Sequence, residues 1–231
     1  MGTFLAISSV VGKTENQVIN SLTNYAISVG GGLQPAATIN SEKQNLCVVK
    51  ALHGNSSIYY PDGYLEWDDS SAFISKELGA PVFSFHIHDG DFWMYTLYNN
   101  GQAIDQFNPM PDYWDDSLTD AEIHHWKGDA HSIAGVVPYI SVKSIERYLV
   151  RWNIDDEEPT KAYPTDEFSQ EYWQLTDFMN KLKLPYPLNE NGNAEGQTYT
   201  LSTRQLPPVA RPNDTPLKNE PGLKKQWWNF W

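Results

Sequence analysis

Residues 81–114 carry the clearest structural signal in the chain and read PVFSFHIHDGDFWMYTLYNNGQAIDQFNPMPDYW. Three largely apolar runs follow one another here, separated by Asp89-Gly90 and by Asn99-Asn100-Gly101. Asp-Gly and Asn-Gly pairs supply the positive φ values that short hairpin turns require. The stretch therefore predicts a three-stranded antiparallel meander.

The first strand of this meander has two chemically different faces, because side chains alternate along a strand. Phe83, Phe85 and Ile87 share one face, whereas His86 and His88 share the other. We expect the first face to be buried and the face that carries the imidazoles to be half-exposed.

Strand and helix patterns alternate before the meander, and helical patterns follow it. The expected elements are a strand at 3–11, a helix over 14–29 that begins with a capping box at Thr14, strands at 46–52 and 57–60, a helix at 71–78 capped by Asp68 or Asp69, the meander, helices that begin at Thr119, Asp129 and Ser141, and a helix over 168–182. The first part has the order β-α-β-β-α-β, which is that of ferredoxin-like domains. The predicted fold is therefore α+β: a ferredoxin-like (βαββαβ) antiparallel sheet extended by a β-meander, followed by a helical region and an extended C-terminal tail.

Three regions differ in composition. Residues 1–110 are expected to form the α+β sheet domain, residues 111–184 a helical region packed on it, and residues 185–231 a loop and a Pro-rich extended tail. An edge strand is expected at 197–203. From Arg204 onward, five basic and two acidic residues give a net charge of +3, so the preceding part carries −16. We expect this tail to dock on its own acidic body or on a partner.

Composition excludes several classes of protein. A net charge of −13 repels phosphate backbones, so we expect no nucleic-acid partner. No apolar run has the length of a bilayer span, and we expect no membrane association. Cys47 is the only cysteine and stands between apolar residues, which predicts a buried strand thiol. These features favour a cytoplasmic location.

A metal site is one hypothesis for the meander. His86 and His88 project the same way from one strand, and Asp91 follows closely, so imidazole and carboxylate groups could together bind one Zn or Fe ion. The stretch resembles the beginning of the HxHxDH motif of metallo-hydrolases, although Asp89 stands one place too early and no terminal His follows. This resemblance implies a metal-dependent hydrolase centred on His86, His88 and Asp91.

An interaction surface is the other hypothesis. Aromatic residues make up 13% of the chain, and both faces of residues 92–98 are apolar, so we expect this strand to be covered on both sides. The predicted binding residues are Trp93, Tyr95, Tyr113 and Trp114.

We find no sequence motif that fixes a reaction, such as a Gly-x-Ser-x-Gly elbow around a nucleophilic serine. The leading expectation is a non-catalytic cytoplasmic binding or interaction protein of bacterial type, without a cofactor. It would be an inhibitor or immunity-like protein for a basic partner, or would bind a second copy of itself as a homo-oligomer. The alternatives are the metal-dependent hydrolase and a domain that binds a small ligand in a pocket lined by the aromatic residues.

Overall fold

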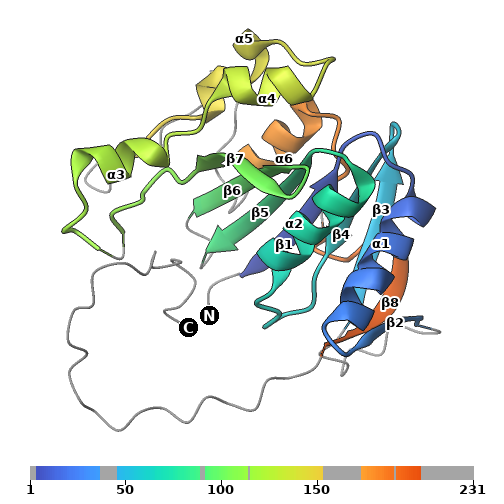
Figure 1. Cartoon of the computed structure of the whole chain (residues 1–231). Helices are drawn as coiled ribbons and strands as arrows, with labels where there is room; N and C mark the ends of the chain where they lie inside the picture. The colour runs from blue at the N-terminus through green and yellow to red at the C-terminus, as the bar shows by residue number, and fades with distance from the viewer. Residues whose placement is uncertain are drawn as a thin grey trace, which may run out of the picture.

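The computed structural model describes residues 4–36, 46–88, 92–113, 115–152, 173–189 and 191–203. These residues form an α+β fold around an eight-stranded sheet in the order β2-β8-β3-β4-β1-β5-β6-β7 (Figure 1). All neighbouring strands pair antiparallel. The strands are β1 (Leu5–Val10), β2 (Gly32–Pro35), β3 (Leu46–Leu52), β4 (Asn55–Tyr59), β5 (Val82–His88), β6 (Phe92–Asn99), β7 (Gln102–Phe107) and β8 (Gln197–Ser202).

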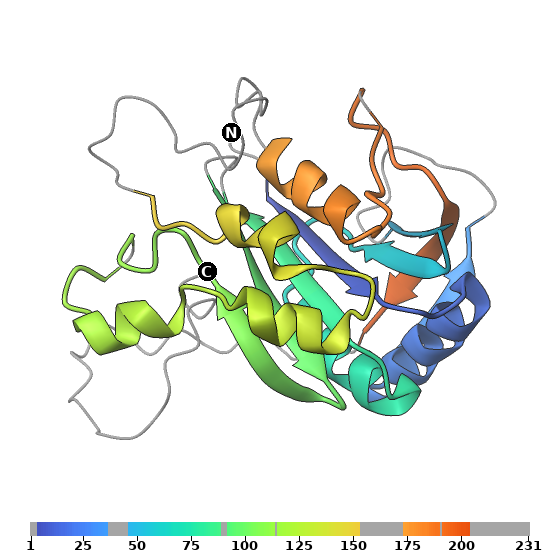
Figure 2. The same ribbon diagram turned by 90° about the horizontal axis from the view of Figure 1, so that it is seen from above.

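Helices cover both faces of this sheet. Figure 1 shows α1 and α2 side by side along one face, and Figure 2 shows α4, α5 and α6, in yellow to orange, over the sheet as seen from above. The helices are α1 (Glu15–Ser28), α2 (Trp67–Leu78), α3 (Asp120–His125), α4 (Ala130–Val136), α5 (Val142–Ile145) with the following 3₁₀ helix η1 (Glu146–Tyr148), and α6 (Trp173–Lys181).

The core under α1 and α2 is built from the even-numbered side chains of β1. In α1, the Thr14 capping box that the sequence predicted is present, and Val18, Leu22 and Tyr25 are buried against the sheet. Helix α2 lies close to β1 because small hydroxyl side chains meet there. Ser8 Oγ lies 2.6 Å from Ser71 Oγ. Hydrogen bonding satisfies these hydroxyls in a dry interface.

The core on the opposite face joins the meander to α4, α5 and α6. Phe83 and Phe85 of β5 are fully buried there, and Phe178 of α6 packs edge-on against Phe85 with ring centroids 6.3 Å apart. Ile133 of α4 and Ile145 of α5 complete the same core. Helices α4, α5 and α6 therefore form a layer over one face of the sheet.

The predicted meander is confirmed for the residues that the structure describes. Strands β5, β6 and β7 pair consecutively, with Phe85 opposite Tyr95 and Tyr95 opposite Phe107. Asn100 and Gly101 both have positive φ, 50° and 80°, as a tight hairpin turn requires. Asp89-Gly90, the other predicted turn, lies outside the described residues.

Two predicted helices have different bounds in the structure. Helix α2 begins at Trp67 and not at residue 71, with Glu66 at the N-cap position and no side-chain cap. The Trp67 side chain is buried, and this burial extends the helix through the position where the sequence predicted an Asp cap. After Ser141 only α5 forms before the chain tightens into η1.

The expected edge position of the last strand was wrong. Strand β8 lies between β2 and β3, with Thr200 opposite Gln34 on one side and opposite Leu46 on the other. Its inward side chains Tyr199 and Leu201 are buried in the core under α1 and α2. Sequence alternation reveals a strand but not its neighbours, because pairing depends on distant segments.

Candidate functional site

His86 and His88, the two predicted metal ligands on β5, lie at one end of the sheet. Their expected half-exposure was wrong, because the side chains are 5% and 4% exposed. They belong to the sheet face that carries α1 and α2, where the first turn of α2 covers His86. Both faces of β5 are therefore buried.

The His86 imidazole is held by an aromatic stack. The Trp67 indole lies parallel to it, with ring centroids 4.8 Å apart and 3° between the ring planes. Burial lowers the pKa of His86 from 6.5 to about 3, and the neighbouring His88 lowers it further in the same direction. His86 is therefore a neutral aromatic core residue at neutral pH.

His88 is the centre of an aromatic cluster that reaches the surface. Three rings surround its imidazole: the centroid distances are 5.1 Å to Phe4, 5.5 Å to Phe92 and 5.9 Å to Tyr113. Phe92 is buried, but Phe4 and Tyr113 are 40% and 41% exposed. We call Phe4 and Tyr113 the aromatic rim. Two exposed rings thus rest on a buried histidine and a buried phenylalanine.

A buried carboxylate lies on the same sheet face. Asp68, in the first turn of α2, is 6% exposed. Burial raises its pKa from 3.8 to about 6, although the hydroxyls of Ser84 and Tyr98 act in the opposite direction. Asp68 is therefore a titratable group inside the core, next in the chain to the Trp67 that stacks on His86.

The predicted metal site is only partly described. The His86 and His88 ring centroids are 6.3 Å apart. Two imidazoles on one tetrahedral zinc ion place their centroids about 5 Å apart, given Zn–N bonds of about 2.0–2.1 Å. The rings would have to approach by about 1 Å to share such an ion. Within the described ranges no group of three His, Cys, Asp or Glu side chains could hold a metal ion. Asp91 lies outside those ranges, so the metal site stays a prediction.

The four predicted binding residues do not gather at one place. Trp93 and Tyr95 are each 2% exposed and lie in the core with Phe178 of α6, on the sheet face opposite the histidines. Tyr113 belongs to the aromatic rim. Trp114 lies outside the described residues. The structure therefore brings His86, His88 and Tyr113 together and places Trp93 and Tyr95 elsewhere.

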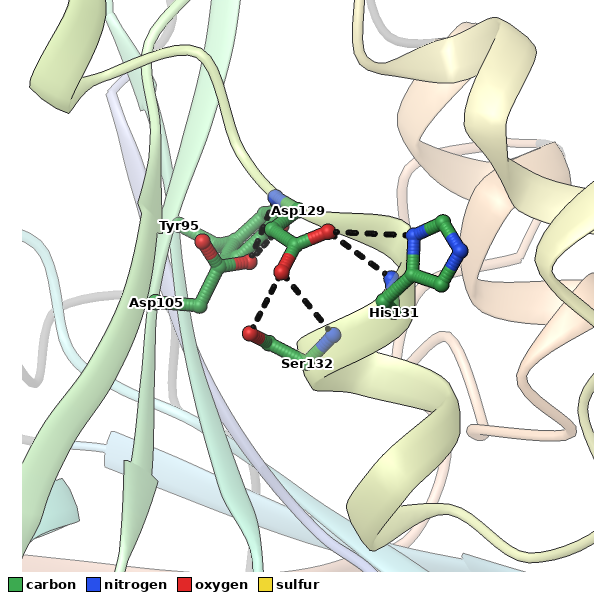
Figure 3. A network of polar contacts seen from close by, with 5 residues as sticks. All are labelled: Tyr95, Asp105, Asp129, His131 and Ser132. Atoms are coloured by element: carbon green, nitrogen blue, oxygen red, sulfur yellow. Dashed lines mark hydrogen bonds and ion pairs between the residues drawn. The ribbon is translucent and has the colours of Figure 1, made fainter.

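Figure 3 shows another group of polar side chains, whose residue types Asp, His and Ser are those of a catalytic triad. The geometry differs, because Ser132 Oγ donates to Asp129 Oδ2 at 2.7 Å. His131 Nδ1 lies 3.5 Å from the other oxygen, Asp129 Oδ1, and the His131 side chain is 80% exposed. The carboxylate stands between serine and imidazole, so His131 is not placed to accept the serine proton.

These residues fasten a helix to the sheet (Figure 3). The backbone N–H groups of His131 and Ser132 donate to the Asp129 carboxylate at 2.9 and 3.2 Å, which caps α4. Hydrogen bonds, first that from the Ser132 hydroxyl, lower the pKa of Asp129. The Asp129 N–H and the Tyr95 hydroxyl both donate to Asp105 Oδ2, at 3.1 and 2.6 Å. The start of α4 is thereby tied to β6 and β7.

The single thiol has the predicted environment. Cys47 in β3 is fully buried, and burial raises its pKa to about 12. A thiol with so high a pKa holds its proton at neutral pH and is a poor nucleophile.

Sequence reasoning missed three residues of this end of the sheet. The sequence pattern places Phe4 only in a strand, and it places Trp67 and Asp68 before the start of a helix. The sequence contains one signal for Trp67. Trp67, Ser71 and Ile74 are spaced by four and three positions, which places them on one helical face. Nothing local could have paired Phe4 with Tyr113, because they are distant in the chain.

Comparison of the chain with protein-family models, with curated proteins and with solved structures found no match. Among the described residues, no helix combines the length and apolar character that a bilayer span requires. Function is therefore inferred from the residues of this chain.

Proposed function

We propose that this chain is a non-catalytic binding protein, of the inhibitor or immunity type, that recognises a basic partner protein at the aromatic rim. The observation that carries the proposal is the exposure of Phe4 and Tyr113, 40% and 41%, directly over the buried His88. Aromatic side chains on a rigid base bury much area at low entropic cost and dominate protein interfaces.

Carboxylates border the aromatic rim. Asp112 precedes Tyr113, and Asp115 and Asp116 follow within three positions. Asp112 is paired with Arg151 at 2.6 Å, whereas Asp116 is exposed. Asp69, in the first turn of α2 and two positions after the Trp67 that stacks on His86, is exposed as well. Such a surface attracts a basic partner and speeds its association.

The total charge supports the same partner chemistry. The chain has a net charge of −13. A charge of this size attracts a basic protein electrostatically before the two surfaces touch. A second copy of the chain carries the same charge, so electrostatics favour a different, basic protein over self-association. A cytoplasmic location is part of the proposal and is supported by the lone, buried and protonated Cys47.

The proposal also includes a fold relationship. We propose that β3, β4, β1 and β5 with α1 and α2 are a ferredoxin-like core, which β6 and β7 extend on one side and β8 and β2 on the other. The order β3-β4-β1-β5, the antiparallel pairing and the common core of α1 and α2 support it.

The experiment is affinity capture followed by kinetics. The full chain is immobilised, the captured protein is identified by mass spectrometry, and both proteins are then purified and mixed. We expect a partner with a net positive charge and an association rate that falls steeply between low and high salt. Replacing Asp69→Lys and Asp116→Lys together should slow association by about tenfold at low salt, with a smaller change in the dissociation rate.

A matched control uses Asp62→Lys and Glu77→Lys, which change the total charge equally at other exposed positions. The control variant should slow association less than the variant that carries Asp69→Lys and Asp116→Lys. A partner of negative charge, or equal effects of both double variants, would contradict recognition at this surface.

A further inference from the structure

A cleft of about 300 Å³ opens beyond the end of β7, apart from the aromatic rim. Its apolar walls are Phe107 at the end of β7, Pro111 in the following segment, and Ile123 of α3. The volume is at the lower end of the range for small-molecule pockets, about 300–1,000 Å³. A ligand of about the size of an amino acid fits this space.

Asn108 gives the cleft a fixed polar group. Its side chain lines the cleft but is only 5% exposed, and Oδ1 accepts the Met110 N–H at 2.9 Å. This bond fixes the orientation of the amide. Within the described part of the chain, the amide nitrogen donates to no residue. The NH₂ group of this amide is thus held in the cleft wall, and no described residue uses its donors.

Two cations line the same cleft. Arg151 is paired with Asp112 at 2.6 Å through one of its nitrogens, which leaves further guanidinium donors. Lys127 follows α3, and its ammonium makes no ion pair with any residue that the structure describes. Donors therefore exceed acceptors on this side of the cleft. A ligand that supplies acceptor oxygens would balance them.

A negatively charged side chain also lines the cleft. Asp120 and His124, both exposed on α3, complete the lining. One carboxylate at the mouth disfavours ligands with several negative charges, and it can accept an ammonium group. The lining thus suits one carboxylate, with or without an amine, on an apolar stem.

We propose that this cleft binds a small organic monocarboxylate of amino-acid size, with its carboxylate on Lys127, Arg151 and the Asn108 amide and its apolar stem against Phe107, Pro111 and Ile123. The cleft is separate from the aromatic rim, because neither Phe4 nor Tyr113 lines it, and the Arg151–Asp112 ion pair is the link between the two surfaces that the structure describes. Either proposal can fail without the other.

The test uses matched acid and amide probes: phenylacetate against phenylacetamide, and N-acetyl-L-leucine against its amide. Binding to the full chain is followed by chemical-shift titration and by melting temperature. At 10 mM, a probe with a Kd of about 1 mM should raise the melting temperature by about 3 °C. We expect at least one acid to reach this shift, and its amide to bind at least about tenfold more weakly.

Two variants locate the site. Lys127→Met keeps the apolar stem and should weaken binding of the acid by about tenfold, whereas Lys143→Met on α5, outside the cleft, should leave it unchanged. Asn108→Asp keeps the acceptor for the Met110 N–H but replaces the donor with a charge, and should abolish binding without disturbing the turn. No shift with either acid at 10 mM, equal binding of acid and amide, or unchanged binding by Lys127→Met would each overturn the proposal.

Discussion

The Trp67 indole lies flat on the His86 imidazole, with ring centroids 4.8 Å apart and planes 3° from parallel. This stack makes the first turn of α2 part of the core and explains why a histidine on β5 is buried and neutral. It also carries the neighbouring Asp68 into the interior, where the carboxylate is 6% exposed. A pH-dependent stability follows from that placement.

Asp68→Asn should stabilise the protein at high pH. Burial raises the folded-state pKa from 3.8 to about 6, so the folded state holds the proton more tightly. This contribution is fully present below pH 3.8 and is lost as the pH rises through 6. The variant should therefore exceed the wild type by up to about 3 kcal/mol in free energy of unfolding at pH 8, and by little at pH 4. Urea unfolding across this pH range measures the difference.

Asp69→Asn is the matched control, because Asp69 is exposed in the same first turn of α2. Both substitutions remove a negative charge from the helix N-terminus, so that effect cancels in the comparison. Parallel pH profiles for the two variants would show that Asp68 is not buried as described.

Gly128→Ala should destabilise the fold through strain and contact together. Gly128 has φ of 71°, and an added Cβ would lie 3.1 Å from Tyr95 Oη. We expect a loss of about 2–3 kcal/mol in the free energy of unfolding. Gly192→Ala is a control for strain alone, since Gly192 has φ of 73° with no atom within 4 Å of the added carbon. Equal losses at both positions would show that Gly128 is not packed against Tyr95.

Tyr95→Phe should destabilise the protein by about 2 kcal/mol, and more at alkaline pH, where Asp105 is ionised, than in acid, where it is protonated. The lost hydroxyl donates to the Asp105 carboxylate at 2.6 Å. Burial raises the pKa of Asp105, and this hydrogen bond opposes the rise, so its removal affects the ionised carboxylate most. Tyr199→Phe removes a bond to the neutral Gln197 amide and should cost less at both pH values. Equal losses for Tyr95→Phe in acid, where Asp105 is protonated, and at alkaline pH would show that the hydrogen bond does not favour the ionised carboxylate.

The metal content of the purified protein tests the metal hypothesis. The separation of the His86 and His88 rings leads us to expect well under one equivalent of zinc or iron in protein purified without a chelator or a His-tag. Elemental analysis checks this, with His86→Ala/His88→Ala as the comparison. About one equivalent of metal, absent from a double variant that still folds by circular dichroism, would instead favour the metal-dependent hydrolase.

Local sequence signals predicted the elements well. The capping boxes at Thr14 and Thr119 and the Asp129 cap all mark helix starts in the structure. The turn at Asn100 and Gly101 is where the φ argument placed it. These features depend on neighbouring residues, which a sequence displays directly.

Features that depend on distant residues could not be predicted. The position of β8 inside the sheet requires Thr200 to pair with both Gln34 and Leu46, which no local pattern encodes. The burial of His86 likewise depends on Trp67, 19 positions away in the sequence. The polarity of His86 predicts a half-exposed side chain. The stack with Trp67 instead makes its neutral imidazole an acceptable core residue.

The aromatic rim itself gives the most direct test. With the captured partner purified, the affinity of Phe4→Ser/Tyr113→Ser is compared with that of Ile27→Ser/Leu52→Ser, whose side chains are 61% and 47% exposed elsewhere. If the rim is the recognition surface, the first variant should bind at least about tenfold more weakly than wild type while the second binds normally. Wild-type affinity in a folded Phe4→Ser/Tyr113→Ser variant would contradict recognition at the rim.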